Sequence, residues 1–161
     1  MKTYKRILSV CLLVVMVVSA LSVTAYAANT GNTSFYNFTM ETSRRYLNPR
    51  AKENYSPSYV IVTEADNPTR IYVAAHGSYS QLPEDIAANC TWDANGTNAI
   101  WVTIMPRQHY LIRSCVWENG YRYASLGFSV HMSYPNEISG AWSPDSSEAA
   151  QQNYPYAYYY V

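Results

Sequence analysis

The sequence predicts an all-β protein: a small antiparallel β-sandwich or open barrel with one or two short helical turns and one disulfide. Three observations point to this class. Short runs of β-branched and aromatic residues recur along the chain, and Gly, Asn, Asp or Pro separates them. Only two short stretches carry helical signals, and two cysteines follow the apolar start of the chain. Strands with little helix between them are typical of sandwiches and barrels.

The first half of the chain holds three predicted strands. Residues 34–41 alternate in polarity, which places Tyr36 on the same face as the next aromatic residue and the methionine that follows. Residues 59–63 are β-branched and aromatic, and residues 70–75 resume that pattern after an Asp-Asn-Pro-Thr turn. We expect the last two strands to pair as a hairpin.

The second half holds two further strands and a second hairpin. Strands are predicted at 89–92 and 99–104, with an Asp-Ala-Asn-Gly turn between them. Residues 109–117 and 121–132 are long strand-like runs on either side of an Asn-Gly pair. Asn-Gly tolerates the positive φ angles of a type I′ turn, so these two runs are expected to form a hairpin.

Two stretches predict short helical turns. Asp145 followed by Glu148 resembles a capping box, which favours a helix over residues 146–152. A single turn is expected at 82–88, where Pro83 comes early.

The first 27 residues predict a secretory signal peptide, because a basic start and an apolar run lead to Ala-Tyr-Ala. Cleavage is expected between Ala27 and Ala28, leaving a flexible lead-in at 28–33 and one β-sandwich domain at 34–161. Two alternatives remain. The apolar run is at the short limit for an uncleaved membrane anchor, and Cys11 lies in a poor match to a lipoprotein signal.

Removal of the leader changes the charge of the chain from zero to about −3, with eight Lys and Arg against eleven Asp and Glu. A mildly acidic chain argues against a nucleic-acid partner. Of the remaining 134 residues 22 are aromatic, which argues against a disordered chain.

Cys90 and Cys115 are the two cysteines that follow the leader, and they lie 25 positions apart. In an exported chain an even count predicts a disulfide, and closing a loop of this length stabilises a domain by about 3–4 kcal/mol. Two free buried thiols or half of a metal site are the alternatives. The second is poorly supported, since there is no Cys-x-x-Cys and no nearby pair of histidines.

No residue pattern predicts catalysis, a cofactor or a metal site. The histidines 76, 109 and 131 are isolated and are expected to be surface or turn residues. The run around Ser129 half resembles a nucleophile elbow but has His131 in place of the second glycine. The carboxylates are scattered in predicted turns, so they give weak support to a glycoside hydrolase.

Tyrosine is the main functional clue, with fifteen copies after the leader. Its ring can stack on sugars or anchor a protein partner while its hydroxyl meets water or a polar group. Strand formation on half-buried faces is the plainer explanation. The tail 154–161 is expected to close the sheet as a last strand, or else to present Tyr156, Tyr158 and Tyr160 as ligand contacts.

Four cations occur within nine residues, namely Arg44, Arg45, Arg50 and Lys52. We consider them candidate contacts for a phosphate-rich cell-wall polymer. An ordinary solvated loop is the alternative, because two glutamates flank the cluster.

The chain is similar to small secreted proteins of Gram-positive bacteria that have no assigned biochemical role. The cysteine pair, residues 116–124 (VWENGYRYA) and residues 140–146 (GAWSPDS) carry this resemblance. Some such proteins are grouped with bacteriocin-like or envelope-associated peptides. The resemblance implies secretion and a small β-domain, and it assigns no site residue.

The leading functional hypothesis is a secreted, non-catalytic β-domain that binds a glycan, a cell-wall polymer or a surface protein at or outside the cell envelope. Membrane contact is expected only through the leader. A bacteriocin-like secreted antagonist is the alternative, although the acidic charge disfavours direct attack on membranes. A small secreted hydrolase is the second alternative.

Overall fold

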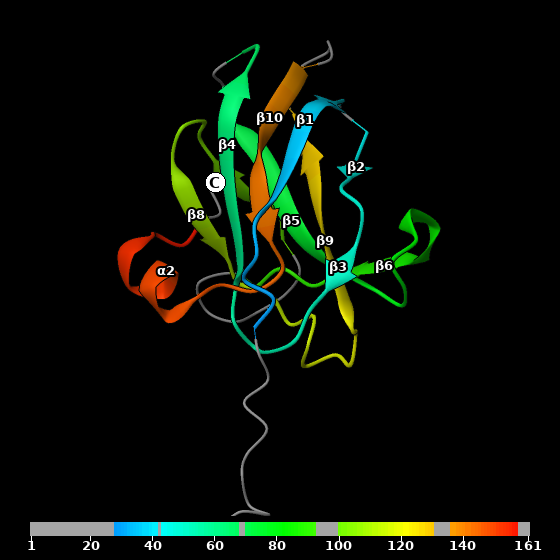
Figure 1. The fold of residues 1–161 in the computed structure, drawn as a ribbon. Helices are drawn as coiled ribbons and strands as arrows, with labels where there is room; N and C mark the ends of the chain where they lie inside the picture. Colours follow the sequence, from blue (N-terminus) through cyan, green and yellow to red (C-terminus); the bar gives the residue numbers. More distant parts are fainter. Residues whose placement is uncertain (1–27, 42, 68–69, 93–99, 131–135, 158–161) are drawn as a thin grey trace, which may run out of the picture.

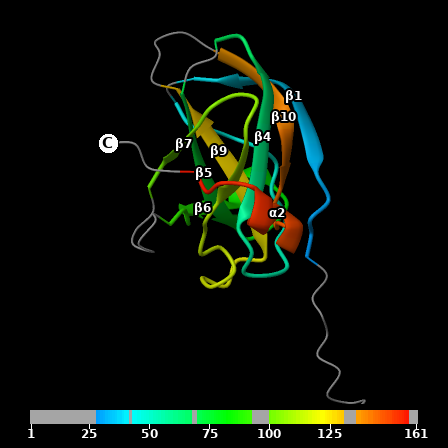
Figure 2. The same cartoon turned by 90° about the vertical axis from the view of Figure 1, so that its left-hand side faces the viewer.

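Two antiparallel sheets face one another and curl toward a half-barrel, as Figure 1 and Figure 2 show. The computed structural model describes residues 28–41, 43–67, 70–92, 100–130 and 136–157. The all-β class and the antiparallel pairing are confirmed, together with one short helix and one 3-10 turn.

The first sheet has four strands. In spatial order they are β1 (Thr33–Met40), β10 (Asn136–Ser143), β4 (Ser58–Ala65) and β8 (His109–Ile112). Strand β10 pairs with β1 on one side and β4 on the other, yet its small and polar residues did not predict a strand. Small size is required here, since a side chain at Gly140 would collide with the carbonyl of Ile61 on β4.

The second sheet is built around two long strands. Its order is β2 (Arg45–Tyr46), β9 (Tyr123–Ser129), β5 (Ile71–Ser78) and β6 (Ile86–Asn89), while β3 (Arg50–Ala51) pairs with β9 and β7 (Val102–Ile104) with β5. The strand predicted at 99–104 is β7. The one predicted at 89–92 lies mostly earlier, as β6, with Thr91 forming an isolated bridge to Ser114.

The core fills the space between the inner faces of the two sheets. Its largest members include Phe35, Met40, Leu126, Phe128, Ile138 and Trp142. Three phenylalanine rings meet there, with the centroids of Phe35 and Phe128 5.8 Å apart.

A bulge in β1 changes which of its side chains face the core. The register against β10 shifts between Phe35 and Phe38, and Asn37 has a φ of 48°. Met40 is therefore buried and Phe38 half-buried, whereas Tyr36 is 76% exposed. The expectation that Tyr36 shares their face is wrong, because an extra residue in a strand reverses the alternation beyond it.

Both predicted hairpins are wrong. A strand lies in each of the four runs, but β8 ends at Ile112 instead of residue 117, and β9 covers only Tyr123–Ser129 of the run 121–132. Strand β4 belongs to the first sheet and β5 to the second, and the same separation holds for β8 and β9. Gly120 has a φ of 81° but Asn119 does not have a positive φ, so the turn is not type I′. Turn residues mark where a chain reverses; they do not say whether the next strand pairs alongside or crosses to the facing sheet.

The helical elements are η1 (Pro83–Asp85) and α2 (Glu148–Asn153). The first lies within the predicted turn at 82–88, and α2 overlaps the helix predicted at 146–152 but ends one residue later. The cap of α2 is Ser147, whose hydroxyl accepts from the Ala150 N–H at 3.2 Å. Asp145 does not cap the helix, because its carboxylate is buried in an ion pair. Neither helical element described is long and apolar enough to cross a membrane.

Candidate functional site

A cavity of about 610 Å³, hereafter the first cavity, opens at one end of the sandwich. The loop before β4, the loop after β8, the start of α2 and the C-terminal tail all contribute to it. In Figure 2 the helix α2 lies in front of the lower part of β4, and the tail continues past β8, with which it pairs. The cavity therefore brings together stretches that are far apart in the sequence, and its size falls within the range of small-ligand sites.

Three aromatic rings line the first cavity. Tyr55 is 69% exposed, and its ring centroid lies 6.2 Å from that of Trp117 in an edge-to-face arrangement. Trp92 is half-buried, and Tyr156 lies beneath the guanidinium of Arg113, 4.1 Å from ring centroid to guanidinium carbon. The rings keep part of their surface available while their neighbours fix their positions.

The tail is held against β8 by backbone hydrogen bonds. The Leu111 N–H donates to the Pro155 carbonyl, and the Ala157 N–H donates to the Leu111 carbonyl, both at 2.9 Å. This short parallel bridge places Tyr156 in the wall of the cavity. Tyr158 and Tyr160, the other predicted contacts of the tail, lie outside the described residues.

Two buried hydroxyls in the wall lack partners. Ser114 is 5% and Ser146 4% exposed, and neither hydroxyl oxygen has a hydrogen-bond partner among the described residues. Buried polar groups in proteins are nearly always bonded to protein, water or ligand. Both residues line the first cavity, but their hydroxyl oxygens are themselves covered, so a bound molecule would reach them only after the serine side chains rotate.

A buried ion pair lies next to residues that line the first cavity. The Lys52 ammonium donates to the Asp145 carboxylate at 2.8 Å, to the Pro144 carbonyl at 2.8 Å and to the Ser56 carbonyl at 2.6 Å. Both charged side chains are fully buried. Burial lowers the pKa of Lys52, while Asp145 and the more distant Glu118 oppose the shift.

The same carboxylate holds the start of the described chain. The second oxygen of Asp145 accepts from the Asn29 N–H at 2.9 Å and the Glu53 N–H at 3.0 Å. Arg50 donates to the Gly31 carbonyl and to the Asn29 side chain. Residues 28–33, for which the sequence predicts a flexible lead-in, thus make specific contacts, and Ala28 lines the first cavity.

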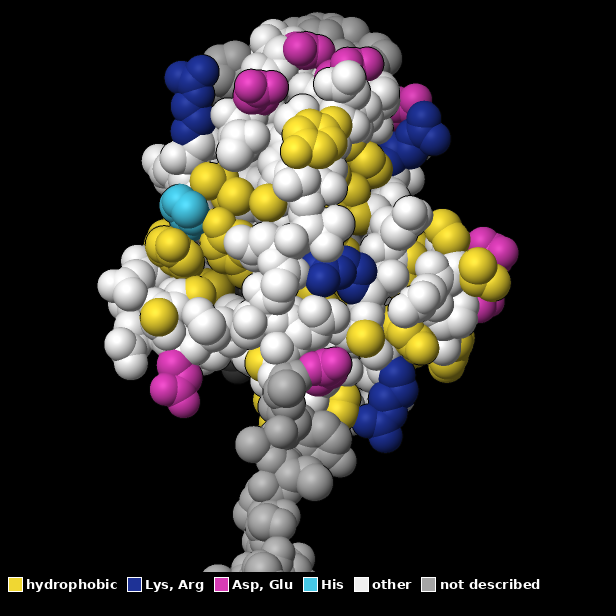
Figure 3. Space-filling view, in the orientation of Figure 1, with side chains coloured by type: hydrophobic (Ala, Val, Ile, Leu, Met, Phe, Trp, Pro, Cys, Tyr) yellow, Lys and Arg dark blue, Asp and Glu magenta, His cyan; other side chains and the backbone are white. Residues whose placement is uncertain are grey.

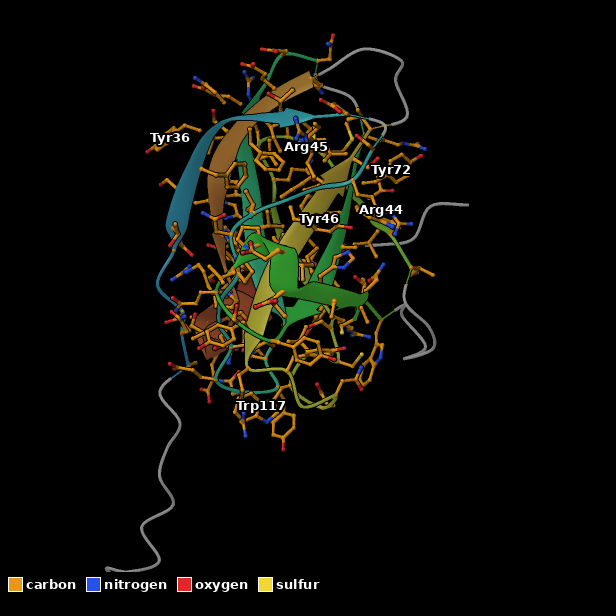
Figure 4. The ribbon with its side chains drawn as sticks, turned by 90° about the vertical axis from the view of Figure 1, so that its right-hand side faces the viewer. Tyr36, Arg44, Arg45, Tyr46, Tyr72 and Trp117 are labelled. Carbon is orange, nitrogen blue, oxygen red and sulfur yellow. The ribbon has the colours of Figure 1, made fainter. Side chains whose placement is uncertain are left out.

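The four clustered cations do not form one exposed patch. Lys52 is buried, and Arg50 is partly covered over the Trp142 ring, 5.7 Å from its centroid. Arg45 makes an exposed pair with Glu41 at 3.2 Å, and Arg44 lies over Trp101. Figure 4 shows Arg44 and Arg45 on the side of the second sheet, and Figure 3 shows cations scattered singly on another face.

Cys90 and Cys115 are buried neighbours that the structure holds as free thiols. The Cys115 N–H donates to the Cys90 carbonyl at 2.8 Å, and the Asn119 side-chain amide lies 3.2 Å from one sulfur and 3.9 Å from the other. Burial raises the pKa of Cys90 to about 11, with the neighbouring thiol adding to the shift. The raised pKa of Cys90 disfavours the thiolate, which is the form of a cysteine that reacts in oxidation.

We expect the protein, isolated under oxidising conditions and denatured without reductant, to leave both cysteines unlabelled by an alkylating reagent, because their proximity favours the disulfide. Reduction before alkylation is the control and should label both. Labelling of both cysteines without reduction would instead show that the thiols persist.

His76 is buried, which corrects the expectation of a surface or turn residue. It is 2% exposed, and the rings of Tyr46 and Trp101 cover it at centroid distances of 4.9 and 6.0 Å. Burial lowers its pKa to about 4, with Arg44 adding to the shift and the Ala87 backbone opposing it. Neither ring nitrogen meets hydrogen-bond geometry. His76 therefore remains neutral near pH 7.

Among the described residues, the charged groups that line the first cavity are Glu118, Glu148 and Arg113. Sequence reasoning treated Glu118 as an isolated turn residue and missed Trp92, Ser114 and Ser146 altogether. Among the residues that the structure describes, no group of His, Cys, Asp or Glu could hold a metal ion. His131 and the Asp-Ala-Asn-Gly turn lie outside them.

Comparison with known proteins places the chain in a family. No curated protein and no solved structure matches it. The sequence model of one family, described as "Protein of unknown function (DUF2712)", matches residues 22–146, which include most of the residues around the first cavity. Since the match covers well over half of the sequence, the chain belongs to the DUF2712 family.

Proposed function

We propose that this protein is a secreted, non-catalytic domain that binds a glycan in the first cavity, at or outside the cell envelope. The observation that carries the proposal is the lining of that cavity: three aromatic rings beside two buried, unpartnered hydroxyls. The leader-like residues 1–27 support export.

The lining suits a sugar because a sugar presents both apolar and polar faces. Aromatic rings can cover its C–H face. Serine hydroxyls, the side-chain amides of Asn54 and Gln151, and the carboxylates of Glu118 and Glu148 can bond to its hydroxyl groups. Aliphatic side chains, which would favour a lipid or an apolar peptide, are few in this wall.

The charges favour a neutral glycan over a phosphate-rich polymer. Two carboxylates and one guanidinium line the first cavity, and the guanidinium already lies over Tyr156. The cations that suggested a phosphate ligand are separated or buried. A polyanion would meet net negative charge at this site and would be repelled.

Replacing Tyr55 by alanine is expected to weaken glycan binding about tenfold, or about 1.4 kcal/mol, because one wall of the cavity loses its ring. Calorimetric titration against a panel of cello-, chito-, xylo-, malto- and manno-oligosaccharides measures the effect. Tyr36→Ala is the matched control, since Tyr36 is 76% and Tyr55 69% exposed but only Tyr55 lines the cavity. Equal losses in both variants, or no binding of any oligosaccharide, would contradict the proposal.

A small hydrolase is a second candidate, favoured by one observation. Glu118 and Glu148 line the same cavity, and a pair of carboxylates is what glycoside hydrolysis uses. Assay of reducing ends released from the oligosaccharide that binds separates the two functions. Turnover that is lost in Glu148→Gln would replace the binding proposal by the catalytic one.

A further inference from the structure

A second cavity of about 270 Å³ adjoins the first. Ser146 and Ser147, at the start of α2, line both cavities. These two residues therefore form part of the partition that separates the two cavities. The second cavity lies just below the usual size of a site for an independent small ligand.

The second cavity repeats the chemistry of the first. Tyr59 and Tyr154 supply aromatic surface, and both are fixed by His109. The Tyr59 hydroxyl lies 2.7 Å from the Nδ1 of His109, and the Tyr154 ring stacks on the imidazole with centroids 4.4 Å apart and planes 10° apart. Polar groups from Asn32 and Asn153 complete the lining.

Ser146 lines both cavities and carries a hydroxyl that no other described residue bonds to. Its hydroxyl is buried and has no partner among the described residues. Its N–H is occupied, since it donates to the Ser56 hydroxyl at 3.0 Å. A bound molecule that crosses the partition would pass Ser146, and rotation of this side chain would bring its hydroxyl to a polar group of that molecule.

We infer that the two cavities are successive subsites for one saccharide chain, which crosses the partition at Ser146 and Ser147. The inference rests on the proposed function and extends it: the ligand is a glycan chain of several units, rather than a single sugar or a disaccharide. Each cavity offers aromatic rings and a set of hydrogen-bonding groups, and a chain of repeating units meets such a repeated pattern.

Affinity should rise with chain length until the ligand reaches the second cavity. Occupying a linked second subsite adds an intramolecular contact, so we expect a gain of about a hundredfold between the shortest and the spanning oligosaccharides. Calorimetric titration of the wild-type protein with each series of the panel, from one unit to eight, measures the gain.

A blocking variant tests where the gain arises. Ala149 is exposed on α2 and lines the second cavity, so Ala149→Trp fills that cavity without changing the core. It should abolish the gain with length while leaving short oligosaccharides at wild-type affinity. Gln152→Trp is the matched control, an exposed position of the same helix that lines neither cavity, and it should keep the gain.

The outcomes separate the two proposals. Binding that is independent of length, or a gain that survives Ala149→Trp, overturns the inference and leaves the proposed function in place. Failure of every series at every length overturns both. An extended peptide that binds with the same dependence on length, and loses that dependence in Ala149→Trp, while the glycans fail, would assign the two cavities to a protein partner instead.

Discussion

Replacing Lys52 by methionine is expected to lower the free energy of unfolding by about 3–5 kcal/mol. The substitution leaves the carboxylate of Asp145 fully buried without its ammonium partner, and it removes the donor to the carbonyls of Ser56 and Pro144. A buried charge without a partner costs far more than the pair contributes. Urea unfolding, with midpoint and slope fitted separately, measures the change.

Arg45→Met is the matched control for this prediction. Arg45 also pairs with a carboxylate, that of Glu41, but the side chains are 53% and 41% exposed. Exposed pairs contribute about 0–1 kcal/mol, so this variant should unfold close to the wild-type midpoint. Similar losses in both variants would show that the buried pair does not carry the stability of this end of the sandwich.

Lowering the pH from 7 toward 4 is expected to remove about 3 kcal/mol of stability through His76. Its pKa is about 4 in the folded protein and about 6.5 when unfolded, so the unfolded chain binds more protons between these values. The contribution is therefore complete above pH 6.5 and is lost as the pH falls toward 4. Urea midpoints measured across this range report the slope.

His76→Phe provides the comparison for the pH prediction. Phenylalanine can occupy the apolar site under Tyr46 and Trp101 without a proton to bind. The variant should lose the His76 part of the slope and retain the part due to carboxylates. An unchanged slope would mean that the pKa of His76 is the same in the folded and unfolded protein, so that its burial does not lower this pKa.

The strands of this protein were largely predictable, and their partners were not. Alternation and β-branched runs reflect the environment of each residue, so β4, β5 and β9 were found from local pattern. Which sheet a strand joins depends on contacts across the core. Strand β10 was missed because Gly140 and its small neighbours fit a crowded centre, a requirement that only the packed sheet reveals.

The candidate site was less predictable than the fold. Tyr156 could be proposed from the density of tyrosine in the tail. Ser114 and Ser146 could not, because their relevance depends on the fold, which buries their hydroxyls and places both residues in the wall of the first cavity. Lys52 is a residue for which the sequence predicted a role in ligand contact and the structure shows a buried ion pair instead. Its neighbours suggested an exposed basic loop, while its partner Asp145 lies 93 positions away.

Both ends of the described chain contribute to the first cavity, through Ala28 and Tyr156. A protein or tag joined close to Ala28 or Tyr156 would therefore stand beside the proposed binding site and compete with its ligand for space. A label or surface attachment belongs elsewhere, and Tyr79, 73% exposed and outside both cavities, is a suitable position for a single coupling residue.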